Sequence, residues 1–194
     1  GSFSFDRKDL SRFLFDLYDY EPKLLRKLIS ARPYVCPFED IERHIPSNAK
    51  VLDVGCGNGD LLALLKEQKQ VNARGLELSP HEAGIALARG LSVIQGDADS
   101  DLEVFPDDGF DVAILSKAIQ QMRRPAFVLQ ELALIAPDMI VSFRNFGLWQ
   151  RRFSLVTTGR MPGHRDWHDD GALHPSTARD MIDLTHAMGL EMVA

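Results

Sequence analysis

Short apolar runs alternate with segments of helical periodicity from about residue 50 to the end of the chain. The apolar runs predict strands at 51–54, 73–78, 92–95, 110–115 and 139–143. The periodic segments predict helices at 60–67, 80–89, 125–134, 148–157 and 176–188. Strands that alternate with helices pair in parallel through right-handed crossovers. The pattern therefore predicts an α/β fold with a mostly parallel open sheet and helices on both of its faces.

The residues before 47 predict short helices instead. Within 9–20, apolar residues fall at helical spacing: Leu10, Phe13, Leu14, Leu17 and Tyr18. Pro22 fits the first turn of a second helix that ends near residue 29, and a third helix is expected over 38–44. We expect residues 1–46 to form a helical cap or to pack on the sheet edge, and residues 47–194 to form the ligand-binding domain. At 190–194 a further strand begins, so the sheet is one strand short or the chain was trimmed.

Composition narrows the choice of function. The length of 194 residues suits one domain, and a formal net charge of −6 argues against binding to nucleic acid. The basic pairs Arg123-Arg124 and Arg151-Arg152 are typical of solvated surface, with contacts to an acidic substrate as the alternative. No stretch approaches the roughly 20 apolar residues of a membrane span, and no signal peptide is present, so we expect a cytoplasmic protein without membrane contact. Gly1-Ser2 resembles the remnant of a removed purification tag.

Three glycines follow the first strand of the predicted sheet. In VLDVGCGNGDLLALL (51–65), Gly55, Gly57 and Gly59 occupy alternate positions, and a helix begins at once. Because glycine has no Cβ, such a turn lets backbone N–H groups approach a ligand at a helix N-terminus. Asp53 comes just before the turn and directs its carboxylate toward any cation in the crevice. We therefore expect a small polar ligand at the carboxyl end of this strand.

The next two strands also end in acidic residues. Glu77 closes the second strand, where an acid can accept both hydroxyls of a ribose. Asp97 closes the third strand, where it can accept a hydrogen bond from an adenine amine. The sixth position of the dinucleotide fingerprint G-x-G-x-x-G is Asp60, whose charge repels a pyrophosphate. S-adenosylmethionine, which has an ammonium and a sulfonium but no phosphate, therefore fits better than a nicotinamide dinucleotide.

These residues carry a resemblance to known families. VLDVGCGNG at 51–59 resembles motif I of the class I S-adenosylmethionine-dependent methyltransferases, which have a Rossmann-like fold. Four further phrases are similar to the MetW family of methionine-biosynthesis proteins: ARGLSVIQGDAD (88–99), FPDDGFDVAILS (105–116), VSFRNFGLW (141–149) and GRMP (159–162). The likeness covers roughly residues 51–190. It departs from the family pattern at Arg144, where a proline is usual, and at Leu148, where a histidine is usual.

The resemblance implies S-adenosylmethionine as cofactor and S-adenosylhomocysteine as product. The residues expected to contact the cofactor are Asp53, Gly55, Cys56, Gly57, Gly59, Glu77, Leu78, Asp97, Ala98 and Ser116. MetW-like proteins are associated with the acylation of homoserine through a partner homoserine O-acyltransferase. Two functions therefore stay open. One is a methyltransferase acting on a small-molecule acceptor, and the other is a noncatalytic S-adenosylmethionine-binding regulator of that acyltransferase.

The acceptor pocket is expected after the fifth strand, at the same rim as the cofactor. Its candidates are Asn145, Phe146 and Trp149, which also fit packing on the core. The loop over 159–175 has no clear period and is typical of a functional loop, in which His168 and His174 are candidates for a general base. Methyl transfer can proceed by positioning alone, so no catalytic residue is assigned. We expect no metal site, because this histidine- and aspartate-rich loop is not helical.

Overall fold

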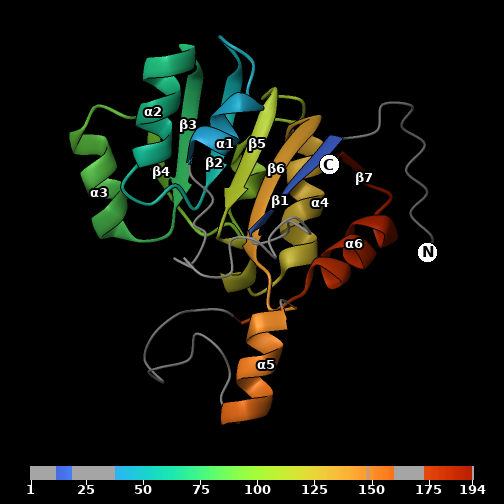
Figure 1. The fold of residues 1–194 in the computed structure, drawn as a ribbon. Helices are drawn as coiled ribbons and strands as arrows, with labels where there is room; N and C mark the ends of the chain where they lie inside the picture. The colour runs from blue at the N-terminus through green and yellow to red at the C-terminus, as the bar shows by residue number, and fades with distance from the viewer. Residues whose placement is uncertain (1–11, 19–37, 148, 160–172, 194) are drawn as a thin grey trace.

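The computed structural model describes residues 12–18, 38–147, 149–159 and 173–193. In these parts of the chain, seven strands form one sheet in the order β4-β3-β2-β5-β6-β1-β7, and each neighbouring pair runs parallel (Figure 1). The strands are β1 (Arg12–Tyr18), β2 (Lys50–Val54), β3 (Asn72–Glu77), β4 (Val93–Gln95), β5 (Val112–Ser116), β6 (Asp138–Arg144) and β7 (Glu191–Val193). The helices are α1 (Phe38–Arg43), α2 (Asp60–Lys69), α3 (Pro80–Ala88), α4 (Pro125–Ile135), α5 (Trp149–Thr158) and α6 (Ala178–Ala187), with the short 3₁₀ helices η2 (Leu102–Val104) and η3 (Ile119–Gln121).

The predicted α/β fold is confirmed, including all five strands and five helices expected after residue 50. Their observed ends differ from the predicted ones by at most two residues. The strand pattern was readable because central parallel strands are covered on both faces and are apolar almost throughout. In β2, for example, Val51, Leu52 and Val54 are all completely buried.

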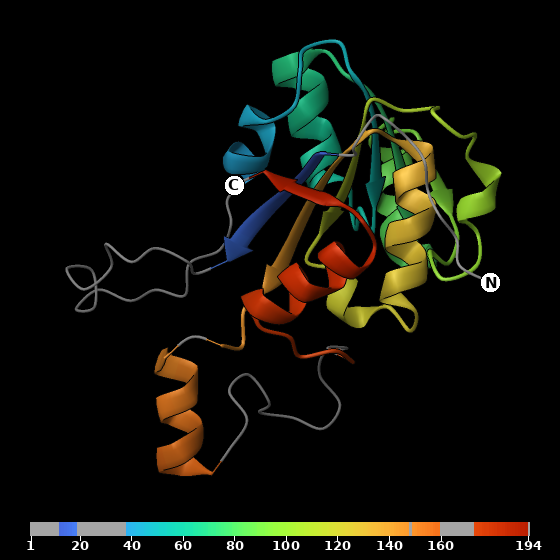
Figure 2. The same ribbon diagram turned by 90° about the vertical axis from the view of Figure 1, so that its right-hand side faces the viewer.

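The core lies in two layers, one on each face of the sheet. Leu52 belongs to a cluster with Leu129 of α4 and Met181 of α6, whereas its neighbour Val51 belongs to a cluster with Ile41 of α1 and Leu65 of α2. Successive residues of a strand point to opposite faces, which explains the division. Figure 2 accordingly shows α1 and α2 on one side of the sheet and α4 on the other.

The strand order reverses beside β2. Within the sheet, β3 and β4 lie on one side of β2, and β5 lies on its other side. The connections that leave the carboxyl ends of β2 and β5 therefore diverge, which in open α/β sheets opens a crevice for ligands. The glycine turn, which occupies residues 55–59, lies at this switch point.

The predicted helix over 9–20 is wrong where the structure describes it. Residues 12–18 form β1, which pairs with β6 through Leu14↔Ile140 and with β7 through Leu14↔Val193. A short apolar run fits a helix or a strand, and two phenylalanines with a tyrosine favour the strand once β6 offers an unpaired edge. Of the expected cap, α1 is confirmed, and the helix predicted from Pro22 lies outside the described residues.

α5 projects from the carboxyl side of the sheet in both views, with Phe153 and Val156 largely exposed (Figures 1 and 2). Among the described residues, no helix has the length and apolarity to cross a bilayer.

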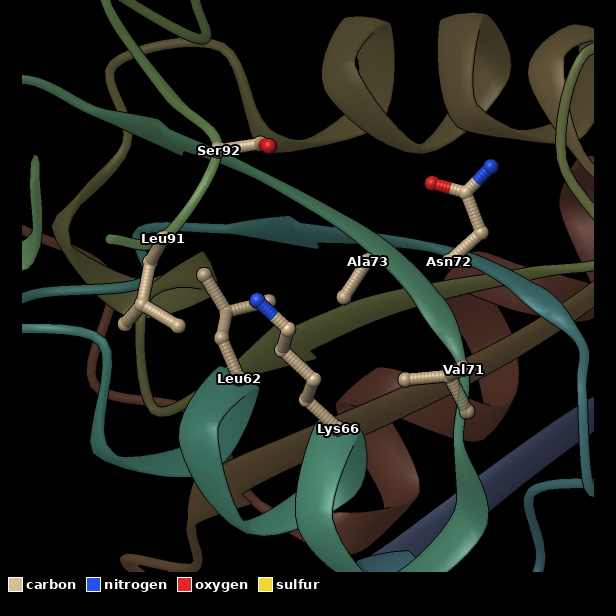
Figure 3. Close-up of a pocket in the computed structure, with 7 residues that line it drawn as sticks. All are labelled: Leu62, Lys66, Val71, Asn72, Ala73, Leu91 and Ser92. Atoms are coloured by element: carbon tan, nitrogen blue, oxygen red, sulfur yellow. The ribbon is translucent and has the colours of Figure 1, made fainter. Parts of the chain in front are cut away.

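A pocket of about 120 Å³ opens beside α2 and the first residues of β3, lined by Leu62, Lys66, Val71, Asn72, Ala73, Leu91 and Ser92 (Figure 3). It contains none of the predicted site residues and is separate from the crevice.

Candidate cofactor site at the strand ends

The glycine turn has a left-handed backbone at each of its three glycines. A Cβ on Gly55 would lie 2.9 Å from Cβ of Ala118, and one on Gly59 would lie 2.4 Å from Cδ1 of Leu91. A Cβ on Gly57 would meet no atom of the described residues within 4 Å. The outer glycines therefore allow close packing, whereas Gly57 borders open space that a ligand can enter.

Glu77 lies at the end of β3 and is bonded to this turn. Its Oε2 accepts a hydrogen bond from the N–H of Gly57 at 2.8 Å, and its Oε1 accepts one from the N–H of Ser79 at 2.8 Å. These donors fix the carboxylate between the glycine turn and the start of α3. Each carboxylate oxygen has a second lone pair, so hydrogen-bonding capacity remains for ribose hydroxyls.

Asp53 is the residue of β2 that breaks its apolar pattern. Its side chain is only 2% exposed, and within the described residues its Oδ1 has no hydrogen-bond partner. Burial, and then the negative charge of Glu77, raise the pKa of Asp53 to about 7. A buried oxygen without a partner is costly, and its presence indicates a missing donor. A cationic ligand group would supply that donor and favour the ionised form.

Asp97 already has two partners in the structure. Its Oδ1 accepts the N–H of Asp99 at 2.9 Å, and its Oδ2 is bonded to the guanidinium of Arg123. Asp99 is 8% exposed and accepts the backbone N–H groups of Arg123 and Arg124 at 2.9 and 2.7 Å. Burial acts to raise the pKa of Asp99, but these donors outweigh it and hold that pKa below its usual value. The prediction of a solvated Arg123 missed this cluster, because only the tertiary fold brings the two segments together.

Asp60 begins α2 beside the crevice. Its Oδ1 accepts a hydrogen bond from Nη1 of Arg89 at 2.7 Å, and the same nitrogen donates to the carbonyl of Asn58 at 2.8 Å. The hydrogen bond from Arg89 is the main cause that lowers the pKa of Asp60. The carboxylate is therefore ionised but partly neutralised, so its repulsion of a pyrophosphate is weaker than the sequence implied.

The remaining predicted cofactor residues differ in exposure. Leu78 follows Glu77 and is 63% exposed, whereas Ala98 is half-buried against the core. Cys56 is buried, and its Sγ would lie 2.5 Å from a Cβ on Gly75, which places it in a packing role within the turn. Burial is the main cause that raises the pKa of the Cys56 thiol to about 12. Ser116 ends β5 with its Oγ 3.3 Å from that of Ser142.

The rim after β6 is held by the buried side chain of Gln120. Gln120 of η3 accepts the N–H of Arg144 at 2.9 Å and donates to the carbonyl of Arg144 at 2.9 Å. A proline at position 144, usual in the family pattern, lacks this N–H donor. The N–H of His174 donates to the Gln120 carbonyl at 3.1 Å, which brings the segment before α6 to the same rim.

The predicted acceptor residues lie along this rim. Asn145 is 4% exposed, and its Oδ1 accepts the N–H groups of Gly147 and Ala178 at 2.8 and 3.3 Å. Phe146 is half-buried and its N–H donates to the carbonyl of Ser176 at 3.0 Å. Trp149 begins α5. The structure thus keeps all three near the ends of β5 and β6.

The structure describes only the last residues of the predicted loop over 159–175, together with Gly159. His168 lies outside the described residues, and His174 is exposed at the start of the segment that leads to α6. Within the described ranges, no group of three or more His, Cys, Asp or Glu side chains is arranged to hold a metal ion. Most of the histidine- and aspartate-rich loop falls in the gap over 160–172, so its role stays a prediction.

Comparison with known proteins places the chain in a family. The profile of methionine biosynthesis protein MetW matches residues 36–194. The bifunctional methionine biosynthesis protein MetXA/MetW of Rhodopirellula baltica is 33% identical over an alignment of 159 residues, and the match covers 75% of this chain and 26% of that protein. Ajmaline N-methyltransferase of Rauvolfia serpentina is 27% identical over an alignment of 118 residues, and the match covers 58% of this chain and 40% of that enzyme. The chain thus spans less than half the length of either relative.

Solved structures show the same fold. An S-adenosylmethionine-dependent methyltransferase from Thermotoga maritima matches with a TM-score of 0.62 and 21% identity, over 79% of this chain and 69% of that one. At this identity the likeness shows the fold alone. With the family match over most of its length, the chain belongs to the MetW family of methionine biosynthesis proteins and has the fold of the S-adenosylmethionine-dependent methyltransferases.

Proposed function

We propose that the chain binds S-adenosylmethionine in the crevice at the ends of β2, β3 and β4 and transfers its methyl group to a small-molecule acceptor. The observation that carries the proposal is the buried Oδ1 of Asp53, which lacks a donor among the described residues beside a glycine turn open at Gly57. A compound with an ammonium group and no phosphate supplies that donor. The methyltransferase fold supports the same ligand.

Each part of the ligand has a proposed partner in this chain. The carboxylate of Asp53 faces the positive charge of the methionine moiety, beside the glycine turn. Glu77 accepts the ribose hydroxyls, and the exposed side chain of Leu78 packs on the adenine. Asp97 accepts the adenine amine, with Ala98 beside it. The binding site therefore uses the ends of three adjacent strands.

Methyl transfer makes few demands on the protein. The bond between the sulfur and the methyl carbon breaks as a bond from the acceptor to that carbon forms, and the positive charge on sulfur disappears. The protein therefore accelerates the reaction mainly by holding the two reactants in line. The rim formed by Asn145, Phe146 and the start of α5 is the proposed side of approach for the acceptor.

A second candidate function rests on the relative from Rhodopirellula baltica, whose name joins MetXA to MetW in one protein. Two proteins that are fused in one organism often bind each other where they are separate chains. A MetXA protein is therefore a candidate partner of this chain. In this alternative, the chain binds S-adenosylmethionine without turnover and regulates a homoserine O-acyltransferase. The family match associates the protein with methionine biosynthesis, and the cytoplasmic location stays a prediction.

Calorimetry separates these functions from a dehydrogenase. We expect S-adenosylmethionine and S-adenosylhomocysteine to bind and NAD to give no heat. Turnover of S-adenosylmethionine with a panel of small acceptors supports the first candidate. If the ligand binds without turnover and changes the rate of a copurified homoserine O-acyltransferase, the second candidate is favoured. Binding of NAD alone would contradict both.

A further inference from the structure

Arg123 connects two crossovers at the adenine end of the proposed site. It lies between η3 and α4, and its side chain reaches back to the turn that follows β4. Nη2 of Arg123 is bonded to Oδ2 of Asp97, and Nε lies 3.4 Å from Oδ2 of Asp99. One guanidinium therefore contacts both carboxylates.

The backbone of Arg123 is fixed independently of its side chain. Asp99 accepts the N–H groups of Arg123 and Arg124, so the buried carboxylate pins the chain just before α4. The turn after β4 is also fixed, because the N–H of Asp97 donates to Oδ2 of Asp101 at 2.7 Å. With both backbones held, the guanidinium and the Asp97 carboxylate start from fixed positions in the chain.

The contact contributes little to folding. The Arg123 side chain is 66% exposed and that of Asp97 is 29% exposed. Ion pairs between exposed groups stabilise a fold little or not at all. The effect of the pair must therefore be sought in the geometry of Asp97.

We propose that Arg123 is a positioning residue that holds the Asp97 carboxylate in place to accept the 6-amino group of the adenine. The inference rests on the proposed function, because it presupposes an adenosyl ligand in the crevice. Each oxygen of Asp97 has one partner in the structure and keeps a second lone pair. An ionised carboxylate only accepts hydrogen bonds, so a purine with an amino group at position 6 is preferred over one with a carbonyl there.

The neighbouring arginine is a matched control. The guanidinium of Arg124 lies over the ring of Phe127, 4.0 Å from its centroid. Arg123→Gln and Arg124→Gln remove the same charge from adjacent positions. They leave the backbone N–H groups that bond to Asp99 in place. Only Arg123→Gln removes the contact with Asp97.

The experiment measures dissociation constants of S-adenosylhomocysteine and of its 6-oxo analogue, S-inosylhomocysteine, by calorimetry. We expect Arg123→Gln to raise the dissociation constant of S-adenosylhomocysteine by about fivefold and that of the 6-oxo analogue by less. The preference for the 6-amino ligand therefore falls. A carboxylate that is no longer held in place forms a weaker hydrogen bond to the 6-amino group, which changes the affinity by about this factor. Arg124→Gln should leave the preference unchanged, and Arg123→Lys should restore part of it. Thermal unfolding verifies that each variant is folded.

The outcomes distinguish the inference from the function on which it rests. If the unmodified protein binds S-adenosylhomocysteine but Arg123→Gln changes neither the affinity nor the preference, Arg123 does not position Asp97. An equal loss for both ligands would reduce Arg123 to a general structural role and would also overturn the inference. If the unmodified protein binds neither ligand, the proposed function itself fails.

Discussion

Two buried aspartates at the same edge of the sheet differ in their surroundings. Asp99 is 8% exposed and receives two backbone N–H groups and the Arg123 side chain, which together keep its pKa low. Asp53 is 2% exposed, and burial raises its pKa to about 7, with one oxygen lacking a partner among the described residues. The first is complete within the chain and serves the fold. The carboxylate of Asp53 lacks one hydrogen-bond donor among the described residues, as expected of a group that binds a cationic ligand.

The largest effect on this comparison is expected at Asp99. Truncation in Asp99→Ala leaves two partly buried backbone donors without their acceptor, which costs about 1 to 3 kcal/mol in the free energy of unfolding. Urea denaturation measures the change. Asp107→Ala, at an exposed position, is the control and should stay within about 0.5 kcal/mol of the unmodified protein. A loss below about 1 kcal/mol for Asp99→Ala would show that these hydrogen bonds are not essential to the fold.

The converse result is expected at Asp53. Asp53→Asn removes a buried charge, so the fold should keep its stability or gain some at pH 8, while the affinity for S-adenosylhomocysteine falls by about tenfold or more. Calorimetry and denaturation of the same sample measure both. A variant that binds as well as the unmodified protein would remove Asp53 from the site.

The raised pKa of Asp53 gives a dependence on pH with a definite sign. Its folded pKa of about 7 lies above the ordinary value of 3.8, so the folded state binds the proton more tightly and ionisation of Asp53 destabilises the fold as the pH rises through 7. The ionised form is the one that attracts an ammonium group. The affinity for S-adenosylhomocysteine should therefore rise by up to about tenfold from pH 6 to pH 8. The Asp53→Asn variant should lack this dependence, and an equal dependence in the variant would assign it to another group.

A smaller effect is expected at Glu77. Glu77→Gln keeps one acceptor oxygen but replaces the other by a donor, so we expect S-adenosylhomocysteine to bind about fivefold more weakly. Glu82→Gln, in the first turn of α3, removes the same charge near the site and serves as the control. An equal loss of affinity in the two variants would mean that Glu77 acts only by its charge. No loss in either variant would mean that Glu77 holds the glycine turn without contacting the ligand.

The sequence predicted most of the fold because its signals are local. The apolar residues of β2, the glycine turn and the acid that ends β3 follow one another within a short stretch of chain, and the structure keeps them together. The segment 9–20 failed because a short apolar run does not distinguish a helix from a strand, and the edge of β6 that decides between them lies more than a hundred residues away.

The partners of the site residues were harder to predict than the residues themselves. Asp60 meets Arg89, and Asp97 meets Arg123, across more than 20 residues of chain in each case. The buried side-chain amide of Gln120 forms hydrogen bonds with the backbone of Arg144. The hydrophobic periodicity of the sequence does not predict this contact. Which acid is satisfied and which is not depends on tertiary contacts, so the contrast between Asp53 and Asp99 required the structure.

The most direct test of the account is a crystal structure of the protein with S-adenosylhomocysteine. We predict that the ligand amino group lies within hydrogen-bonding distance of Oδ1 of Asp53 and that the ribose hydroxyls lie against Glu77. A ligand bound elsewhere, or an Asp53 carboxylate that still lacks a donor with the ligand in place, would contradict it.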